Sequence, residues 1–226
     1  MLIRFVQSLL LFKQLFQWLS LGFALVLAGS TLAAENRSLQ PTILVLGDSL
    51  SAAYGIDQAS GWVNLLQQRL QAQDFHYEVM NASISGETSH GGLNRLPVLL
   101  DRYQPEILII ELGANDGLRG LPLNALQQNL EAMIQLAQKN DAQILLLGME
   151  LPPNYGPAYT RAFQTIYKQL AEQYKTALIP FLLDGIATQR QLMQDDNLHP
   201  VAAAQALVLN NVWPSLQPLL NKTTDR

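Results

Sequence analysis

Cysteine is absent from this sequence of 226 residues, and histidine occurs only three times. Without cysteine the chain forms no disulfide and offers neither a thiol nucleophile nor a thiolate ligand for a metal. Lys and Arg together number 14 against 18 Asp and Glu, and they form no basic cluster. This acidic balance, with a formal net charge of −4, argues against nucleic acids and anionic lipid surfaces as main partners.

The longest apolar run lies near the amino terminus. Arg4 and Lys13 precede Leu15–Ala28, an uncharged run that is shorter than the roughly 20 residues of a membrane span. Small residues at Thr31 and Ala33 then match a signal-peptidase site. We expect residues 1–33 to be a secretory signal peptide and residues 34–226 to be one domain. The mature protein is expected to be periplasmic or secreted, without stable membrane insertion; an uncleaved N-terminal anchor is the alternative.

Downstream of this segment, short apolar runs alternate with helical patterns. The apolar runs are continuous, as is typical of strands that are buried on both faces of a parallel sheet. They are Thr42–Leu46, Phe75–Met80, Ile107–Leu112, Ile144–Leu147 and a weaker run, Ala177–Phe181. Helical spacing of apolar residues occurs after Gly61 and in 123–139 and 158–174, and Pro200 is expected to open a last helix through about Val212. The alternation predicts a three-layer α/β/α sandwich around a parallel sheet of about five strands.

Several polar residues fall after strands or before a helix, at the sheet edge where open α/β proteins place their sites. Ser49 follows the first strand, Gly86 the second and Asn115 the third. Asp196 and His199 are three residues apart in a late loop, so the carboxylate can reach one imidazole nitrogen. Each also has an ordinary interpretation, as a helix-capping serine, a turn glycine or a turn asparagine.

Taken together, these residues supply the parts that acyl transfer needs. A serine hydroxyl becomes a nucleophile when a base removes its proton, and a carboxylate fixes the tautomer of that base. The tetrahedral oxyanion needs preorganised donors, each worth on the order of 3 kcal/mol. We expect the Ser49 and Gly86 amides and the Asn115 carboxamide to converge as these donors.

Other polar residues near the predicted site receive structural interpretations. Asp48 precedes the serine and points away from it in an extended turn, so it is expected to brace the loop. Asp116 is expected to order the loop after the third strand. His76 lies in an expected strand, and His90 lies in a polar turn without a carboxylate partner.

Four segments resemble blocks I, II, III and V of the GDSL/SGNH hydrolases, in that order: ILVLGDSLSAAYG, NASISGETS, ELGANDGLRG and MQDDNLHP. The resemblance extends from about Pro41 to Leu220. It is strongest to the exported bacterial thioesterase I type, which is also described as lysophospholipase and arylesterase. The Gly-x-Ser-x-Gly elbow of ordinary α/β-hydrolases is absent, which agrees with the flavodoxin-like fold of the resembled family.

Position by position, the resemblance implies roles for five residues. Ser49 is implied as the nucleophile, with Asp196 and His199 completing the triad. Gly86 and Asn115 are implied to complete the oxyanion hole with the Ser49 amide. The expected reaction is hydrolysis of an acyl ester, a thioester or a lysophospholipid through an acyl-serine. We expect a monomer that acts on small molecules without cofactor or metal.

The acyl group needs an apolar groove, and the strand-end loops provide candidates for its walls. Leu118 and Leu121 follow the third strand, and Leu151 and Tyr155 follow the fourth. Glycines near Leu118 suggest that this segment moves as a lid.

Three alternatives stay open from the sequence. A carbohydrate O-deacetylase would use the same triad but prefer acetyl groups on sugars. A non-catalytic binding module would keep the fold without the reaction. A metal site made by Asp195, Asp196 and His199 lacks further ligands nearby.

Overall fold

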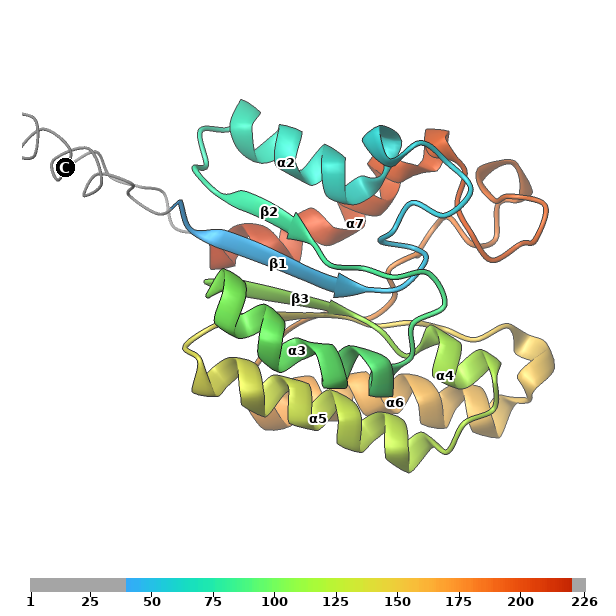
Figure 1. The fold of residues 1–226 in the computed structure, drawn as a ribbon. Helices are drawn as coiled ribbons and strands as arrows, with labels where there is room; N and C mark the ends of the chain where they lie inside the picture. Colours follow the sequence, from blue (N-terminus) through green and yellow to red (C-terminus); the bar gives the residue numbers. More distant parts are fainter. Residues whose placement is uncertain (1–39, 221–226) are drawn as a thin grey trace, which may run out of the picture. The chain divides into compact units, whose positions relative to one another are not determined.

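The computed structural model describes residues 40–220, and the expected signal peptide, residues 1–33, lies outside them. A parallel sheet forms the centre of the described part (Figure 1). Its strands are β1 (Thr42–Gly47), β2 (Glu78–Asn81), β3 (Ile107–Glu111), β4 (Gln143–Leu147) and β5 (Ala177–Ile179). Their order is β2-β1-β3-β4-β5, which is the flavodoxin-like order with its switch point between β1 and β3.

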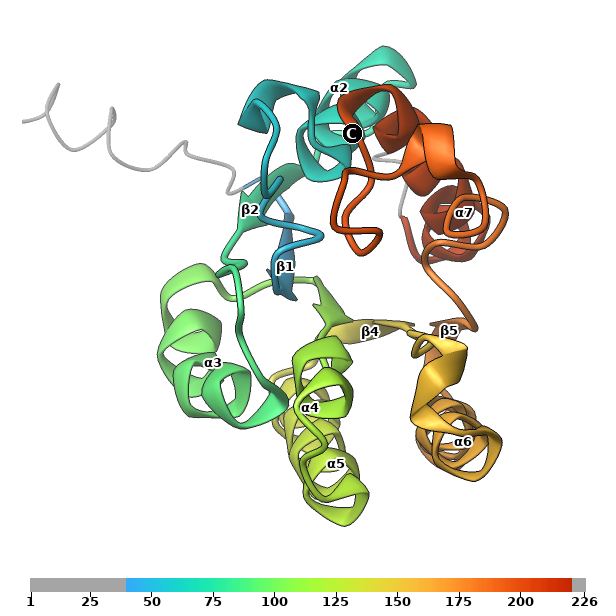
Figure 2. The same ribbon diagram turned by 90° about the vertical axis from the view of Figure 1, so that its right-hand side faces the viewer.

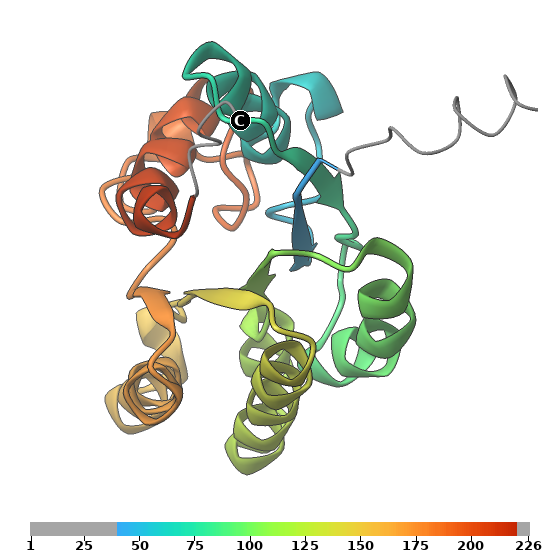
Figure 3. The same ribbon diagram turned by 90° about the vertical axis from the view of Figure 1, so that its left-hand side faces the viewer.

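Helices cover both faces of this sheet, as Figures 2 and 3 show from its two ends. On one face lie α2 (Trp62–Ala72) and α7 (Gln205–Leu216). On the other face lie α3 (Ser89–Tyr103), α5 (Leu123–Lys139) and α6 (Pro157–Tyr174), and the short α4 (Ala114–Leu118) follows β3. The predicted three-layer sandwich is therefore confirmed. Between residues 40 and 220, no helix combines the length and the apolarity that crossing a bilayer requires.

The apolar patterns of the sequence explain this arrangement. All residues of 43–46 and 107–110 are buried, because β1 and β3 are covered by helices on both faces. Helix α5 buries one stripe, formed by Leu126, Leu130, Met133, Ile134 and Ala137. Each fully buried aliphatic side chain contributes about 1.5–3 kcal/mol relative to exposure. The core therefore fixes the strand ends from which the polar loops emerge.

Two helices near the site, α3 and α4, are not among the predicted elements. Helix α3 contains Gly91, Gly92 and Pro97, which are all poor helix formers. Gly92 is needed there, because a Cβ atom at this position would collide with the Leu112 side chain. The prediction that His90 lies in a turn is thus wrong, since it lies in the first turn of α3.

Two further expectations need correction. Pro200 does not open the last helix; it forms an isolated antiparallel bridge with Met193, and α7 begins only at Gln205 after a 3-10 turn, Ala202–Ala204. Strand β2 begins at Glu78 rather than three residues earlier, so His76 precedes the strand. The bridge matters for function, because it closes the loop that carries two of the predicted site residues.

Candidate active site

Ser49 lies in a tight turn that directly follows β1. Gly47 ends the strand, and a Cβ atom there would lie 2.7 Å from Glu111 Oε2, so the backbone passes where only glycine fits. The Ala52 amide donates a hydrogen bond to the Asp48 carbonyl at 2.9 Å and closes the turn. The serine therefore stands at the carboxyl edge of the sheet, as predicted.

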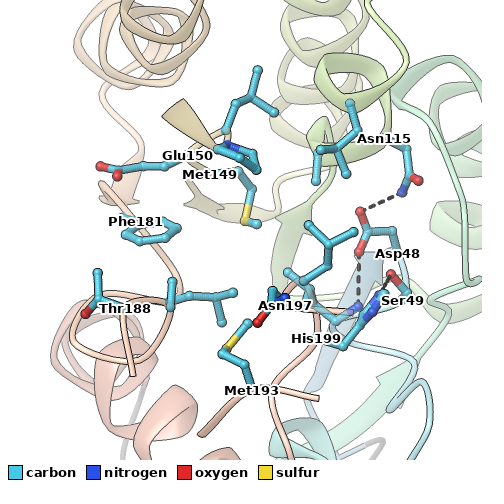
Figure 4. Close-up of a pocket in the computed structure, with 18 of the residues that line it drawn as sticks. Asp48, Ser49, Asn115, Met149, Glu150, Phe181, Thr188, Met193, Asn197 and His199 are labelled. Atoms are coloured by element: carbon cyan, nitrogen blue, oxygen red, sulfur yellow. Dashed lines mark hydrogen bonds between the residues drawn. The ribbon is translucent and has the colours of Figure 1, made fainter. Parts of the chain in front are cut away.

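Two hydrogen bonds join Ser49 to Asp196 through His199. His199 Nε2 lies 2.8 Å from Ser49 Oγ, and His199 Nδ1 lies 2.6 Å from Asp196 Oδ2. Figure 4 shows the serine and the histidine facing each other at one end of a pocket. The structure thus brings together the three residues that the sequence proposed as a triad.

The carboxylate of Asp196 is held through both of its oxygens. Oδ1 accepts hydrogen bonds from the Leu198 amide at 2.9 Å and the His199 amide at 3.1 Å, and Oδ2 faces the imidazole. Partial burial raises the pKa of Asp196, but the hydrogen bonds from the His199 ring and the two amides outweigh it and lower that pKa overall. Asp196 is therefore an ionised partner for the imidazole.

Hydrogen bonds within the loop that carries His199, and a ring contact from Tyr54, hold this loop and its histidine in place. The Gln194 amide donates to the His199 carbonyl at 2.7 Å. Arg190 Nη1 donates to the carbonyls of Met193 and Gln194 at 2.9 and 3.0 Å. The Tyr54 ring lies against the imidazole, with 4.6 Å between centroids. These contacts restrict the orientation of the histidine ring.

The loop after β2 brings a second backbone donor to the same edge. The Ile84 amide donates to the Gly47 carbonyl at 3.0 Å, so this loop stays attached to the end of β1. Gly86 has φ +79°, a backbone conformation that favours glycine, and its carbonyl accepts from Arg119 Nη2 at 2.8 Å. Within residues 40–220, neither the Ser49 amide nor the Gly86 amide donates to a protein acceptor. Both N–H groups remain available to a ligand oxygen.

Asn115 supplies a side-chain donor from α4. Its Nδ2 atom donates to Asp48 Oδ2 at 3.0 Å (Figure 4). Asn115 lines the same cavity as Ser49 and His199. A carboxamide nitrogen carries two hydrogens, so one N–H is left for a ligand.

Asp116 joins α4 to α3, in agreement with the ordering role expected for it. Its Oδ2 accepts from the Ser89 amide at 2.8 Å and its Oδ1 accepts from the Ser89 hydroxyl at 2.5 Å. Asn129 Nδ2 on α5 donates to the same hydroxyl at 2.9 Å. The segment of Asn115 is thereby attached to two larger helices.

Two buried carboxyl groups lie beside the Ser49 turn, those of Asp48 and Glu111. Asp48 Oδ1 accepts from the Leu50 amide at 3.1 Å, as expected of a residue that braces the loop. Burial raises the pKa of Asp48 to about 6, although its hydrogen bonds and His199 oppose the shift. Burial and the charge of Asp48 raise the pKa of Glu111 well above its usual value. Glu111 is not among the site residues predicted from the sequence, where its signal is a single acidic residue at the end of an otherwise apolar strand.

A cavity of about 440 Å³ extends from Ser49 and His199 between the strand-end loops. In Figure 4 its far end is marked by Phe181 and Thr188, on the opposite side from Ser49. Of the predicted walls, Leu118 and Leu151 line it, whereas Leu121 and Tyr155 do not. The other lining side chains are mainly apolar and include Met149, Pro152, Phe181, Leu183 and Met193.

Tyr155 and Leu121, the two predicted wall residues that do not line the cavity, lie close to the wall or on the surface. The Tyr155 hydroxyl donates to the Leu118 carbonyl at 2.9 Å, so this tyrosine supports the wall from behind. Leu121 is partly exposed in the loop after α4.

The metal hypothesis has no geometric support. Asp195 accepts from Arg190 Nη2 at 2.7 Å in an exposed ion pair, while Asp196 faces His199. Among the residues that the structure describes, no three His, Asp or Glu side chains are grouped so that they could hold a metal ion.

Comparisons with known proteins find relatives that match most of the chain. A model of the GDSL-like Lipase/Acylhydrolase family matches residues 45–207. The esterase TesA of Pseudomonas aeruginosa is 53% identical over 199 residues, which are 87% of this chain and 99% of the relative. The thioesterase 1/protease 1/lysophospholipase L1 of Escherichia coli K12 is 40% identical over 211 residues, 93% of this chain and 97% of the relative.

A solved structure is also similar over most of the chain. The crystal structure of the psychrotrophic esterase EstA from Pseudoalteromonas sp., described as inhibited by monoethylphosphonate, superimposes with a TM-score of 0.75 at 46% identity. The match covers 78% of this chain and 97% of the esterase.

Proposed function

Because the chain belongs to the GDSL-like lipase/acylhydrolase family, we propose that it hydrolyses acyl esters and thioesters through an acyl-serine intermediate. The observation that carries the proposal is the hydrogen-bond chain from Ser49 Oγ through His199 to Asp196. A largely apolar cavity that begins at these residues supports a substrate with an acyl chain.

In the proposed reaction Ser49 is the nucleophile. Its Oγ attacks the carbonyl carbon while His199 Nε2, 2.8 Å away, takes the hydroxyl proton. Asp196 holds the Nδ1–H side of the ring, which fixes the tautomer and stabilises the imidazolium that forms.

The negative charge that develops on the carbonyl oxygen needs donors at the serine turn. The Ser49 and Gly86 amides and the second N–H of Asn115 are proposed to bind it. Removing one donor of this kind typically lowers kcat by about 10²–10³. The donors come from three different strand ends, so the rigid sheet sets their relative positions.

Collapse of the tetrahedral intermediate breaks the carbonyl–oxygen or carbonyl–sulfur bond. His199 then gives its proton to the leaving alcohol or thiol, and the acyl group stays on Ser49. A water molecule attacks the acyl-serine with His199 again acting as base, which releases the carboxylic acid and restores the hydroxyl.

The acyl chain is proposed to enter the cavity bounded by Leu118 and Leu151. Tyr155 would act on this wall indirectly through the Leu118 carbonyl, and Leu121 would cover the entrance. Esterase, thioesterase and lysophospholipase are the activities in the names of the relatives. Substitution of Leu118 and Leu121 by alanine should change the chain-length profile; an unchanged profile contradicts the assignment of this wall.

The decisive experiment uses purified residues 34–226. It compares p-nitrophenyl esters of graded chain length, a lysophospholipid, an acyl thioester and an acetylated sugar. We expect turnover of the acyl esters and loss of turnover in Ser49→Ala, with Ser60→Ala as a matched control away from the site. An active Ser49→Ala contradicts the mechanism, and a preference for the acetylated sugar favours a carbohydrate O-deacetylase instead.

We also propose that residues 1–33 are removed during export and that residues 34–226 act as a monomer in the periplasm or outside the cell. The pattern of a charged start, an apolar run and small residues before Ala34 supports this. Intact-mass measurement on protein from the periplasmic fraction, followed by gel filtration, tests both points. A mass that retains residues 1–33 favours the uncleaved anchor.

A further inference from the structure

Glu111 ends β3 directly beside the turn that carries Ser49. In the register of the sheet it pairs with Gly47, the last residue of β1. Its side chain is 0% exposed, and no step of the proposed reaction uses it. A fully buried carboxyl group next to a reactive serine is costly to keep unless it makes specific contacts.

One oxygen of this carboxyl group holds the serine turn from both sides. Glu111 Oε2 accepts a hydrogen bond from the Ser51 hydroxyl at 2.7 Å and from the Asp48 amide at 3.1 Å. These two residues flank Ser49 on either side. The contact also explains Gly47, because a Cβ atom there would lie 2.7 Å from the same oxygen.

Further hydrogen bonds extend from these two residues to the neighbouring strand ends. Asn81 Nδ2, at the end of β2, donates to the Ser51 carbonyl at 2.8 Å. The Asp48 side chain accepts from Asn115 Nδ2 at 3.0 Å. A shift of the turn away from Glu111 would therefore displace both the nucleophile and the acceptor that orients one proposed oxyanion donor.

The surroundings of Glu111 favour a neutral carboxyl group. Within the described residues its Oε1 atom is buried and has no hydrogen-bond partner. Its other oxygen faces two neutral donors, and the nearby charged group is the Asp48 carboxylate. Ionisation would place a second negative charge next to the first in a fully buried site, which costs several kcal/mol.

We propose that Glu111 is a positioning residue that, as a neutral acid, holds the Ser49 turn in its reactive geometry through the Asp48 amide and the Ser51 hydroxyl. The proposal rests on the function proposed above and assigns a role to a residue that touches neither substrate nor reacting atoms. Glutamine has the same shape as a neutral glutamic acid and retains an oxygen acceptor. Leucine fills a similar volume without any acceptor.

The test measures kcat and KM of Glu111→Gln and Glu111→Leu on a p-nitrophenyl ester, with active sites counted by a fluorophosphonate. Glu111→Leu should lower kcat per titrated site by about 50-fold or more at nearly constant KM, because the donor positions are lost. Glu111→Gln should stay within about fivefold of the parent, since the acceptor remains. A role in folding alone would lower the number of titrated sites and leave kcat per site unchanged.

Two outcomes overturn the proposal. One is a Glu111→Leu enzyme with parental kcat per site; the other is a Glu111→Gln enzyme as impaired as Glu111→Leu, which would mean that the charge is needed. If Glu111→Leu does not fold, Ser51→Ala removes the shorter contact, and an unchanged kcat overturns the proposal equally. Ser49→Ala in the same assay tests the reaction separately: full activity there would refute the proposed function, whatever Glu111 does.

Discussion

Asn115 Nδ2 donates a hydrogen bond to Asp48 Oδ2 at 3.0 Å. A carboxylate accepts hydrogen bonds and does not donate them, so this contact selects the nitrogen end of the carboxamide rather than its oxygen end. The second N–H of Asn115 is then directed away from Asp48. Asp48 thus has a role that its place next to the serine does not reveal: it sets the orientation of a proposed oxyanion donor.

Replacing Asp48 with asparagine should separate activity from stability. The NH2 group of an asparagine at position 48 would face the NH2 group of Asn115, or the Asn115 carboxamide would turn to avoid this contact. Either change misplaces the proposed oxyanion donor, so kcat should fall by about 100-fold. The free energy of unfolding at pH 8 should not fall, because the substitution removes a buried charge whose pKa is raised to about 6. Steady-state kinetics and urea unfolding measure the two effects.

The control for this prediction is Asn115→Ala, alone and combined with Asp48→Asn. If Asp48 acts through Asn115, the double variant loses little more kcat than either single variant. Losses that multiply would show that the two residues act independently.

The stability of the protein should respond to pH through Glu111. Its pKa is raised in the folded state, mainly by burial, so the folded protein keeps a proton that the unfolded chain releases. The unfolding free energy therefore decreases as pH rises from the unfolded pKa towards the folded one. Glu111→Gln lacks this titration, so its unfolding free energy relative to that of the parent should rise between pH 5 and pH 8. Urea unfolding at both pH values measures the difference, and a difference independent of pH contradicts the assignment.

Asp196→Asn should impair the reaction far more than the fold. An asparagine amide facing His199 Nδ1 favours the wrong imidazole tautomer, so kcat should fall by about 10³–10⁴. The side chain is partly exposed and lies in a surface loop, so thermal unfolding should change little. Differential scanning calorimetry measures the thermal unfolding, and ester kinetics measures kcat. If Asp196→Asn keeps more than about a tenth of parental kcat, Asp196 is not the acid of the proposed triad.

Thr188→Phe should shorten the preferred acyl chain. Thr188 lies at the end of the cavity away from Ser49 (Figure 4), so a larger side chain there blocks long chains and leaves short ones unaffected. We expect kcat/KM for a C12 ester to fall at least about tenfold while that for a C4 ester stays within about threefold. Gln189→Phe, one residue further and outside the lining, is the matched control. Equal losses on both esters would mean that the chain does not reach Thr188.

Secondary structure could be predicted from the sequence where the pattern of apolar residues within the element itself indicates a strand or a helix. Strands β1 and β3 are predicted correctly because their apolar runs are continuous. Helix α5 is predicted correctly because its apolar residues recur at helical spacing. Helix α3 is missed because Gly91, Gly92 and Pro97 weaken its pattern, and tertiary packing of Gly92 against Leu112 decides the conformation.

In the candidate site, too, local sequence patterns predict some residues, whereas contacts between distant parts of the chain cannot be predicted from them. Ser49, Asn115 and His199 could be found from their places after strands and from the resemblance to a family. The partners of Glu111 could not, because the contact between Glu111 and Ser51 joins residues 60 positions apart. The position of Tyr54 on the imidazole ring is likewise set by the folded loops rather than by any local pattern.

The contact between Ser49 and His199 spans 150 positions of the chain. Loop closure over such a distance is favourable only when the intervening strands have assembled, so Ser49 meets His199 late in folding. A nascent or partly unfolded chain therefore contains the serine without a working esterase. Loss of turnover during denaturation should coincide with loss of the sheet, which makes ester hydrolysis a direct assay of how many molecules have completed their fold.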